Sequence, residues 1–212
     1  MNKIHVIMPF SRLHLKDTLI EAYRPMGIIL YPIMFKEEYS EFNEDWIVPV
    51  YVPEYDADCD CWGKGAYKRN WFIENCEIHD NDYYLTADDD DMYEPDVMDR
   101  VKQLNDDIVI ISLKRGDHTP EGVTPERCYE TSTLFACPEN VRIGGISSQQ
   151  SFVKGKIFKK YLFITSTNCA DGKMAIKHKE DGEQTRYEPY LFALFNYYEP
   201  GRWEINNGDN GG

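Results

Sequence analysis

The sequence lacks several features that would place it in a common functional class. Its 212 residues contain no run near the ~20 apolar residues of a membrane span, and the start MNKIHVIMPFSR is too short in apolar residues for a signal peptide. The six cysteines include no C-x-x-C pair, which excludes zinc-site spacing and favours reduced thiols in a cytosolic protein. The net charge of −14 leaves no basic excess for nucleic acid. An acidic protein that binds phosphate groups therefore needs a metal ion between its own carboxylates and the phosphates.

The composition is that of a globular protein, with 42% hydrophobic and 14% aromatic residues. The length suits one domain with a sizeable core, which we expect to cover residues 1–205. No internal repeat is visible. The tail NNGDNGG (206–212) is expected to be disordered, and an end without a capping element indicates that further domains of a longer chain follow.

Apolar strands that alternate with amphipathic helices predict an α/β fold, with a mostly parallel central sheet covered by helices. We expect strands at 3–10, 28–35, 46–53, 82–88 and 106–115. We expect helices at 14–27, 65–78, 94–104 and, after a loop, 186–201.

The stretch YYLTADDDDMYEPD (83–96) places four consecutive aspartates directly behind an apolar strand. Like charges this close raise each other's pKa, and capping of the next helix accounts for only one or two of them. Hard divalent cations take carboxylate oxygens and hold phosphate oxygens on their open positions. The Asp-x-Asp-x-Asp-Gly pattern of a calcium loop is absent. The run therefore predicts a Mg²⁺ or Mn²⁺ site for a phosphate-bearing ligand; a solvated acidic turn is the alternative.

Three segments resemble glycosyltransferase family 2, whose members have the GT-A fold. The family's Asp-x-Asp segment resembles YYLTADDDDMYEPDVM, its Arg-Asn helix resembles GKGAYKRNWFIEN, and its first strand and nucleotide loop resemble VIMPFSR. The residues that fall on family positions are Asp88, Asp90, Asp91, Pro95, Asp96, Arg69 and Asn70. The match covers roughly residues 3–115.

This resemblance implies a single GT-A-type (Rossmann-like) domain in which residues 1–115 bind the nucleotide sugar and 116–205 bind the acceptor. It implies a metal-dependent hexosyltransferase that uses Mn²⁺ or Mg²⁺ to move a sugar from a UDP-sugar to a glycan or glycoprotein. The whole chain also resembles the amino-terminal domain of glycosyltransferases encoded by large algal (chlorella) viruses. That resemblance implies a glucose- or rhamnose-like donor, a capsid glycoprotein acceptor and a location in the host cytoplasm.

The donor site follows from the same comparison. Asp90, helped by Asp88, is expected to bind the metal, and Asp89 or Asp91 to accept hydrogen bonds from ribose or sugar hydroxyls. Glu37 is expected to read the uracil N–H. Trp62 can stack on a sugar or base; partly buried packing is the alternative. Other expected donor contacts are Pro9, Phe10, Ser11, Arg12, Lys68, Arg69 and Asn70. A solvated helix face is the alternative for Lys68 and Arg69.

The acceptor half carries fewer signals. The pair Glu180-Asp181, expected before a late helix, resembles the family's catalytic pair and predicts Asp181 as the base; an acidic loop is the alternative. Asp171 is a second candidate for base or sugar contact. His178 is a candidate third metal ligand; a lone surface histidine is the alternative. The family's Gln-x-x-Arg-Trp segment is missing, which leaves a retaining course open.

Two other functions remain as alternatives. A sugar nucleotidyltransferase usually has a Gly-rich loop after its first strand, and PFSRLHLK has none. A nucleotide- or carbohydrate-binding domain without turnover would keep the same residues.

Overall fold

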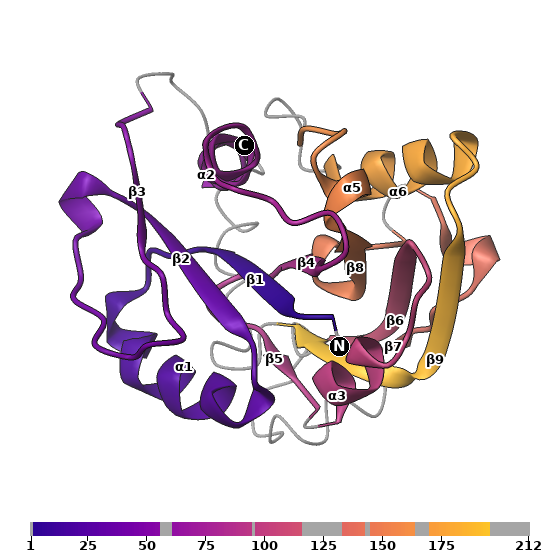
Figure 1. The fold of residues 1–212 in the computed structure, drawn as a ribbon, viewed down its shortest axis with the longest axis horizontal. Helices are drawn as coiled ribbons and strands as arrows, with labels where there is room; N and C mark the ends of the chain where they lie inside the picture. The colour runs from indigo at the N-terminus through magenta and orange to yellow at the C-terminus, as the bar shows by residue number, and fades with distance from the viewer. Residues whose placement is uncertain are drawn as a thin grey trace, which may run out of the picture.

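A curled sheet of nine described strands forms the centre of the fold (Figure 1). The computed structural model describes residues 2–55, 61–94, 96–115, 133–142, 145–163 and 170–195. The strands are β1 (Ile4–Pro9), β2 (Ile29–Phe35), β3 (Val50–Val52), β4 (Tyr83–Thr86), β5 (Met92–Tyr93), β6 (Ile108–Arg115), β7 (Thr133–Leu134), β8 (Ser151–Lys154) and β9 (Thr185–Phe195). The α-helices are α1 (Lys16–Tyr23), α2 (Cys61–Asn75), α3 (Val97–Lys102), α5 (Gly155–Phe158) and α6 (Ala170–Glu180). The 3₁₀ turns are η1 (Leu13–Leu15), η2 (Arg24–Met26), η3 (Lys36–Glu38), η4 (Pro138–Asn140) and η5 (Ser148–Gln150).

The amino-terminal half of the sheet is parallel, in the order β3-β2-β1-β4. The central strand β1 is buried on both faces, which explains its nearly continuous apolar sequence IHVIMP. Its side chains alternate between the two faces, because Val6 and Met8 belong to one core cluster and Ile7 to the other. The predicted α/β class and the strands of this half are confirmed.

The carboxyl-terminal half of the sheet is mixed, so the expectation of a mostly parallel sheet holds only for the first half. Strand β8 lies between β4 and β6 and runs antiparallel to both, whereas β9 is parallel to β6. Strands β5 and β7 add antiparallel edges to β9 and β6. Hydrophobic patterning shows that a segment is a strand but does not specify its direction in the sheet, which explains the difference.

The predicted helix at 186–201 is wrong within the described residues, because 185–195 form strand β9. The segment is rich in Tyr and Phe, which favour strands, and Pro189 would break a helix. The register with β6 shifts between Ile111 and Ser112, which creates a bulge that accommodates Pro189. The Ser112 hydroxyl donates to the Pro189 carbonyl at 2.9 Å. Helix α6, which precedes this strand, was not predicted.

Two hydrophobic clusters cover the two faces of the sheet. Helices α1 and α3 pack on one face through Leu19, Tyr23, Val97 and Val101. Helices α2, α5 and α6 pack on the other face through Phe72, Phe158 and Ala175. The helices therefore flank the sheet on both sides, as expected from their amphipathic patterns (Figure 1).

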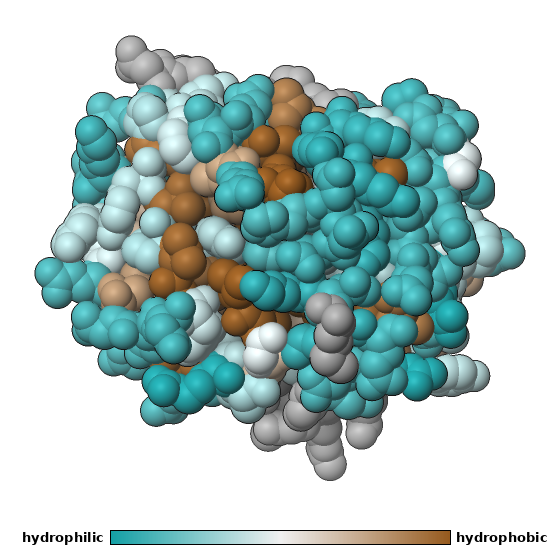
Figure 2. All heavy atoms as spheres, viewed as in Figure 1, coloured by the Kyte–Doolittle hydropathy of each residue, from teal (hydrophilic) through white to brown (hydrophobic). Residues whose placement is uncertain are grey.

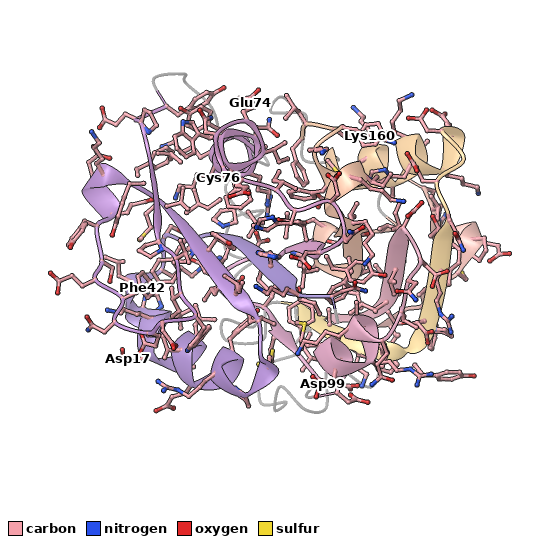
Figure 3. All side chains as sticks on the ribbon, in the orientation of Figure 1. Asp17, Phe42, Glu74, Cys76, Asp99 and Lys160 are labelled. Carbon is pink, nitrogen blue, oxygen red and sulfur yellow. The ribbon has the colours of Figure 1, made fainter. Side chains whose placement is uncertain are left out.

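The surface combines hydrophilic residues with a few exposed hydrophobic ones, among them Leu13, Tyr39 and Tyr190. The face in Figure 2 is largely hydrophilic, with hydrophobic residues gathered in a band across its middle. Asp17, Glu74, Asp99 and Lys160 project outward from their helices or helix ends in Figure 3 and are exposed. In the described part of the chain, no helix has the length and apolar character that crossing a bilayer requires.

Candidate functional site

The ends of β1 and β4 bring two predicted segments together at one edge of the sheet. The strands are parallel neighbours, and Ala87 N–H donates to the Ile7 carbonyl at 3.1 Å. The aspartate run after β4 therefore lies beside the loop that follows β1, where open α/β sheets bind ligands. Pro95, the Trp62 side chain and the tail at 206–212 lie outside the described residues.

Asp89 holds the loop that follows β1. Its Oδ2 accepts the backbone N–H groups of Ser11 at 2.7 Å and of Arg12 at 2.8 Å. Its Oδ1 also pairs with the Arg12 guanidinium, and the side chain is 2% exposed. Asp89 is therefore engaged with protein donors. Its predicted contact with a ribose or sugar hydroxyl would have to be made in addition to these bonds.

Asp90 is a buried carboxylate with a perturbed pKa. It is 2% exposed, and Arg12 Nη2 lies 3.2 Å from its Oδ2. Burial raises its pKa to about 7; Arg12 opposes this rise, and the charges of Asp88 and Asp89 add to it. An additional positive charge, such as a divalent cation, would stabilise the ionised form of this buried carboxylate.

Asp88 and Asp91 close the run into a turn. Asp88 N–H donates to Asp91 Oδ2 at 2.8 Å, and Asp91 N–H donates to the Asp88 carbonyl at 3.2 Å. Asp91 is fully buried, which places its carboxylate in the role of shaping the turn. Asp88 remains partly exposed at 29%, with Arg69 Nη2 at 2.5 Å from Oδ1 and Gln149 Nε2 at 2.9 Å from Oδ2.

Gln149 was not predicted from the sequence. It lies in SSQQS (147–151), a polar stretch between apolar segments. The structure forms η5 there, and this turn brings Gln149 from the second half of the chain to Asp88. The only local signal was an unusual pair of consecutive glutamines before a buried strand.

Two basic residues of helix α2, Lys68 and Arg69, are buried against the site, which excludes a solvated helix face for them, whereas Lys64 on the same helix is exposed. Their contact with a donor stays a prediction. Lys68 is 3% exposed and donates to the Phe10 carbonyl at 3.1 Å and to Glu38 at 2.5 Å. Burial lowers the pKa of Lys68, and Glu38 opposes this effect. The acid that reaches the site after β2 is thus Glu38, whereas Glu37 is exposed. Phe10 is buried with Pro9 beside it at the end of β1.

The residues present fit a divalent cation that is shared with a ligand. Within the described ranges, no three His, Cys, Asp or Glu side chains converge to form a complete metal cage. Mg²⁺ is typically held by one or two carboxylates plus phosphate oxygens, and a complete cage is not required. Asp88 and Asp90 supply two such carboxylates, and their mutual repulsion raises the pKa of Asp90.

Asp171 lies at the start of α6, near the aspartate run. Burial raises its pKa; Arg69 opposes this rise, and the charge of Asp88 adds to it. These electrostatic neighbours place Asp171 within interaction range of the proposed donor site. A carboxyl with a raised pKa next to a ligand site is suited to proton transfer.

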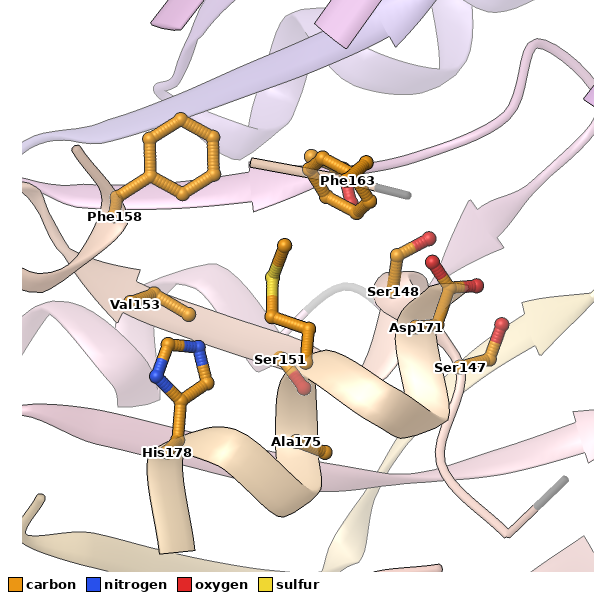
Figure 4. A pocket seen from close by; sticks show the side chains of 11 residues that line it. Ser147, Ser148, Ser151, Val153, Phe158, Phe163, Asp171, Ala175 and His178 are labelled. Carbon is orange, nitrogen blue, oxygen red and sulfur yellow. The ribbon is translucent and has the colours of Figure 1, made fainter. Parts of the chain in front are cut away.

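A small cavity of about 20 Å³ opens beside Asp171 (Figure 4). Its lining combines hydroxyl groups with an apolar wall: Thr86, Ser147, Ser148, Ser151, Val153, Phe158, Phe163, Asp171, Met174, Ala175 and His178. His178 Nδ1 is buried and has no hydrogen-bond partner among the described residues, whereas Ser148 interacts with the Asp171 carboxyl and opposes the rise of its pKa that burial causes. The volume suits a single water molecule, which would satisfy such a group.

The structure separates Glu180 and Asp181 from this site, whereas His178 lines the cavity beside Asp171. Asp181 follows α6, ten residues after Asp171 and so roughly 15 Å further along the helix at ~1.5 Å per residue. It pairs with Lys177 at 2.9 Å and accepts the Tyr161 hydroxyl, and Glu180 is exposed. The pair therefore follows a helix and does not precede one. His178 is 6% exposed and faces the Tyr161 ring at 4.7 Å; it lies two turns of α6 away from Asp171.

The comparisons with known proteins show the fold. A mannosyltransferase from Pyrobaculum calidifontis, solved with GDP-Man and Mn²⁺, has 14% sequence identity and a TM-score of 0.60 over 97% of this chain and 60% of that one. TarS (1–349) from S. aureus, solved with UDP-GlcNAc, has 12% identity and a TM-score of 0.57 over 92% of this chain and 58% of that one. This chain thus spans about three fifths of these two chains. No protein-family model and no curated protein matches the sequence.

Proposed function

We propose that this chain is a metal-dependent glycosyltransferase that transfers a sugar from a UDP-sugar to a glycan acceptor. The observation that carries the proposal is the aspartate run at the carboxyl end of β4, which lies against the β1 loop and α2 in a GT-A-like fold. The donor is a glucose- or rhamnose-like UDP-sugar and the acceptor a capsid glycoprotein, as the resemblance to the algal-virus enzymes implies. The two solved structures described above hold GDP-Man and UDP-GlcNAc, which supports a nucleotide sugar as the donor.

Asp90 and Asp88 would hold the divalent cation. When bound, the cation supplies positive charge that stabilises the diphosphate leaving group. Further positive charge near the diphosphate would come from side chains of the protein. Arg12 contacts Asp90, and Arg69 contacts Asp88, so both guanidinium groups lie where a diphosphate would approach. Asp89 fixes the Ser11–Arg12 backbone and thereby orients the loop.

Asp171 is our candidate for the general base of an inverting displacement. In that reaction the acceptor hydroxyl loses its proton to Asp171 while its oxygen bonds to the anomeric carbon, and the bond from that carbon to the diphosphate breaks. The raised pKa of Asp171 favours acceptance of the proton. Asp181 stays a prediction as the alternative base.

A binding domain without turnover is the second candidate, and one observation favours it. Arg12 and Arg69 already pair with three of the four carboxylates, so part of the negative charge is compensated without a metal. Hydrolysis or transfer from a UDP-sugar, measured with and without Mn²⁺, distinguishes the two functions.

The proposal is tested by the melting temperature with UDP, in chelator and with Mn²⁺. A ligand at a hundredfold excess over its Kd stabilises the folded state by about 2.7 kcal/mol. For a domain of this size, a shift of roughly 5–10 °C follows, at ~2–4 °C per kcal/mol. Asp90→Asn should remove most of the Mn²⁺-dependent part. Equal stabilisation of both proteins by UDP in chelator would show that the aspartates are not a metal site.

A further inference from the structure

The Asp88 carboxylate is held by two donors from different halves of the chain. Arg69 on α2 donates to Oδ1 at 2.5 Å, and Gln149 in η5 donates to Oδ2 at 2.9 Å. Each oxygen thus has a fixed partner, although the side chain keeps 29% of its surface exposed. We propose that Gln149 is a positioning residue that aims Asp88 at the divalent cation, an inference that rests on the proposed function.

Gln149 is itself held rigidly. It is 2% exposed, and its backbone carbonyl accepts the Tyr93 hydroxyl at 3.1 Å. Its side-chain oxygen accepts the Ser147 hydroxyl. Because a carboxylate only accepts hydrogen bonds, the amide NH₂ group must face Asp88, and the side-chain oxygen is left to accept the Ser147 hydroxyl. The direction of the hydrogen bond to Asp88 follows from this network.

A neutral amide suits this role better than a second cation would. An amide N–H orients a carboxylate without cancelling its charge, so Asp88 keeps its negative charge for a metal ion. The charge of Arg69, in contrast, acts on both Asp88 and Asp171. Partners that orient metal ligands typically change metal affinity or activity by 10–100-fold when they are removed.

The neighbouring Gln150 offers a matched control. It has the same side chain, lies in the same turn and is also fully buried. Its hydrogen bonds go to the Ile111 carbonyl at 2.9 Å and, as acceptor, to Ser147 N–H at 2.9 Å. Removal of the Gln150 amide therefore weakens the turn without removing the donor to Asp88.

The experiment compares Gln149→Met and Gln150→Met with the parent by calorimetric titration of Mn²⁺ in the presence of UDP. Methionine keeps the length of glutamine but removes the donor. We expect Gln149→Met to weaken Mn²⁺ binding by about 10–100-fold. Gln150→Met should lower the melting temperature yet leave the Mn²⁺ affinity within about twofold of the parent. Gln149→Asn keeps an amide but has a side chain that is shorter by one methylene group. It should lose Mn²⁺ affinity to the same extent as Gln149→Met. This variant replaces Gln149→Met in the experiment if the methionine variant does not fold.

The outcomes separate this inference from the proposed function. If the parent binds Mn²⁺ with UDP and Gln149→Met binds it equally well, Gln149 does not position Asp88. If both methionine variants lose affinity in proportion to their loss of stability, the role of Gln149 is only structural and the inference is wrong. If the parent shows no Mn²⁺-dependent UDP binding, the proposed function fails first and the inference fails with it.

Discussion

The side-chain amide of Asn70 forms two hydrogen bonds with the backbone of Phe163. Its Nδ2 donates to the Phe163 carbonyl at 2.8 Å, and Phe163 N–H donates to Asn70 Oδ1 at 2.6 Å. The pair joins residues 93 positions apart and ties α2 to the segment that follows α5. Phe163 is 4% exposed and lines the cavity beside Asp171, and Arg69 lies over its ring at 5.5 Å.

Asn70→Ala should therefore destabilise the protein. The change removes two hydrogen bonds and leaves the Phe163 backbone groups without these partners, at a cost of about 1–3 kcal/mol. The free energy of unfolding from urea denaturation measures the loss. Asn75→Ala, at an exposed position on the same helix, is the control and should change stability by less than about 0.5 kcal/mol. A loss of stability no larger than that of the control would show that the two hydrogen bonds to Phe163 contribute nothing to the free energy of unfolding.

The two candidate bases make opposite predictions for a pair of variants. If Asp171 takes the proton, Asp171→Asn should reduce sugar transfer by ~10²–10⁴-fold and change the affinity for UDP and Mn²⁺ little. Asp181→Asn should then transfer at nearly the parent rate, because Asp181 is tied to Lys177 and Tyr161 at the other end of α6. The initial rate of transfer from a UDP-sugar checks both variants. The reverse result would restore Asp181 as the base.

Much of the donor half could be predicted because its signals are local. The apolar strand at 4–9 and the aspartates behind 83–86 are encoded in contiguous residues, and parallel pairing then brings the strand ends together. The basic residues of α2 were placed at the site by family resemblance alone. Their burial beside Glu38 and Asp88 depends on how α2 packs against the sheet, which no local pattern specifies.

The second half was less predictable for physical reasons. Helix α6 is rich in lysine and has a weak apolar face, ADGKMAIKHKE, so its pattern does not differ clearly from that of a polar loop. The aromatic segment of β9 has spacings compatible with either a helix or a strand, and only its pairing with β6 decides between them. Gln149 contacts Asp88 across 61 positions of sequence, so its role follows from tertiary packing.

The buried imidazole of His178 should make the protein less stable in mild acid. Burial lowers the pKa of His178 from 6.5 to about 4, so the folded state keeps the ring neutral where the unfolded chain protonates it. The unfolded state binds the extra proton between these values, and the free energy of unfolding therefore falls as the pH decreases from 6.5 towards 4. At ~1.4 kcal/mol per pKa unit, the full effect is on the order of 3 kcal/mol.

His178→Phe should remove this part of the acid sensitivity, since phenylalanine does not titrate and can keep the contact with the Tyr161 ring. Urea denaturation of parent and variant near neutral pH and near pH ~4.5 measures the change. The variant should gain stability relative to the parent as the pH falls. A difference between the two proteins that is the same at both pH values would show that His178 is not protonated more easily in the unfolded chain.

Replacement by asparagine should change the melting temperature in opposite directions at the adjacent residues Asp89 and Asp90. Asp89→Asn should lower the melting temperature of the ligand-free protein, because the carboxylate accepts two backbone N–H groups and pairs with Arg12. A loss of about 1–3 kcal/mol is expected for weakening these bonds. Asp90→Asn should instead raise the melting temperature at pH 7 and above, because burial makes an ionised Asp90 unfavourable in the folded state.

The pH dependence distinguishes this explanation from a general change in net charge. The folded-state pKa of Asp90, about 7, exceeds the value of 3.8 for the exposed group, so stability from the bound proton is present at low pH and is lost as the pH rises through about 7. The advantage of Asp90→Asn over the parent should thus grow between about pH 4 and pH 7 and be small near pH 4. Scanning fluorimetry in chelator, at both ends of this range, measures both variants. Net charge alone would shift Asp89→Asn and Asp90→Asn in the same direction, and that outcome would contradict the separate roles assigned to the two carboxylates.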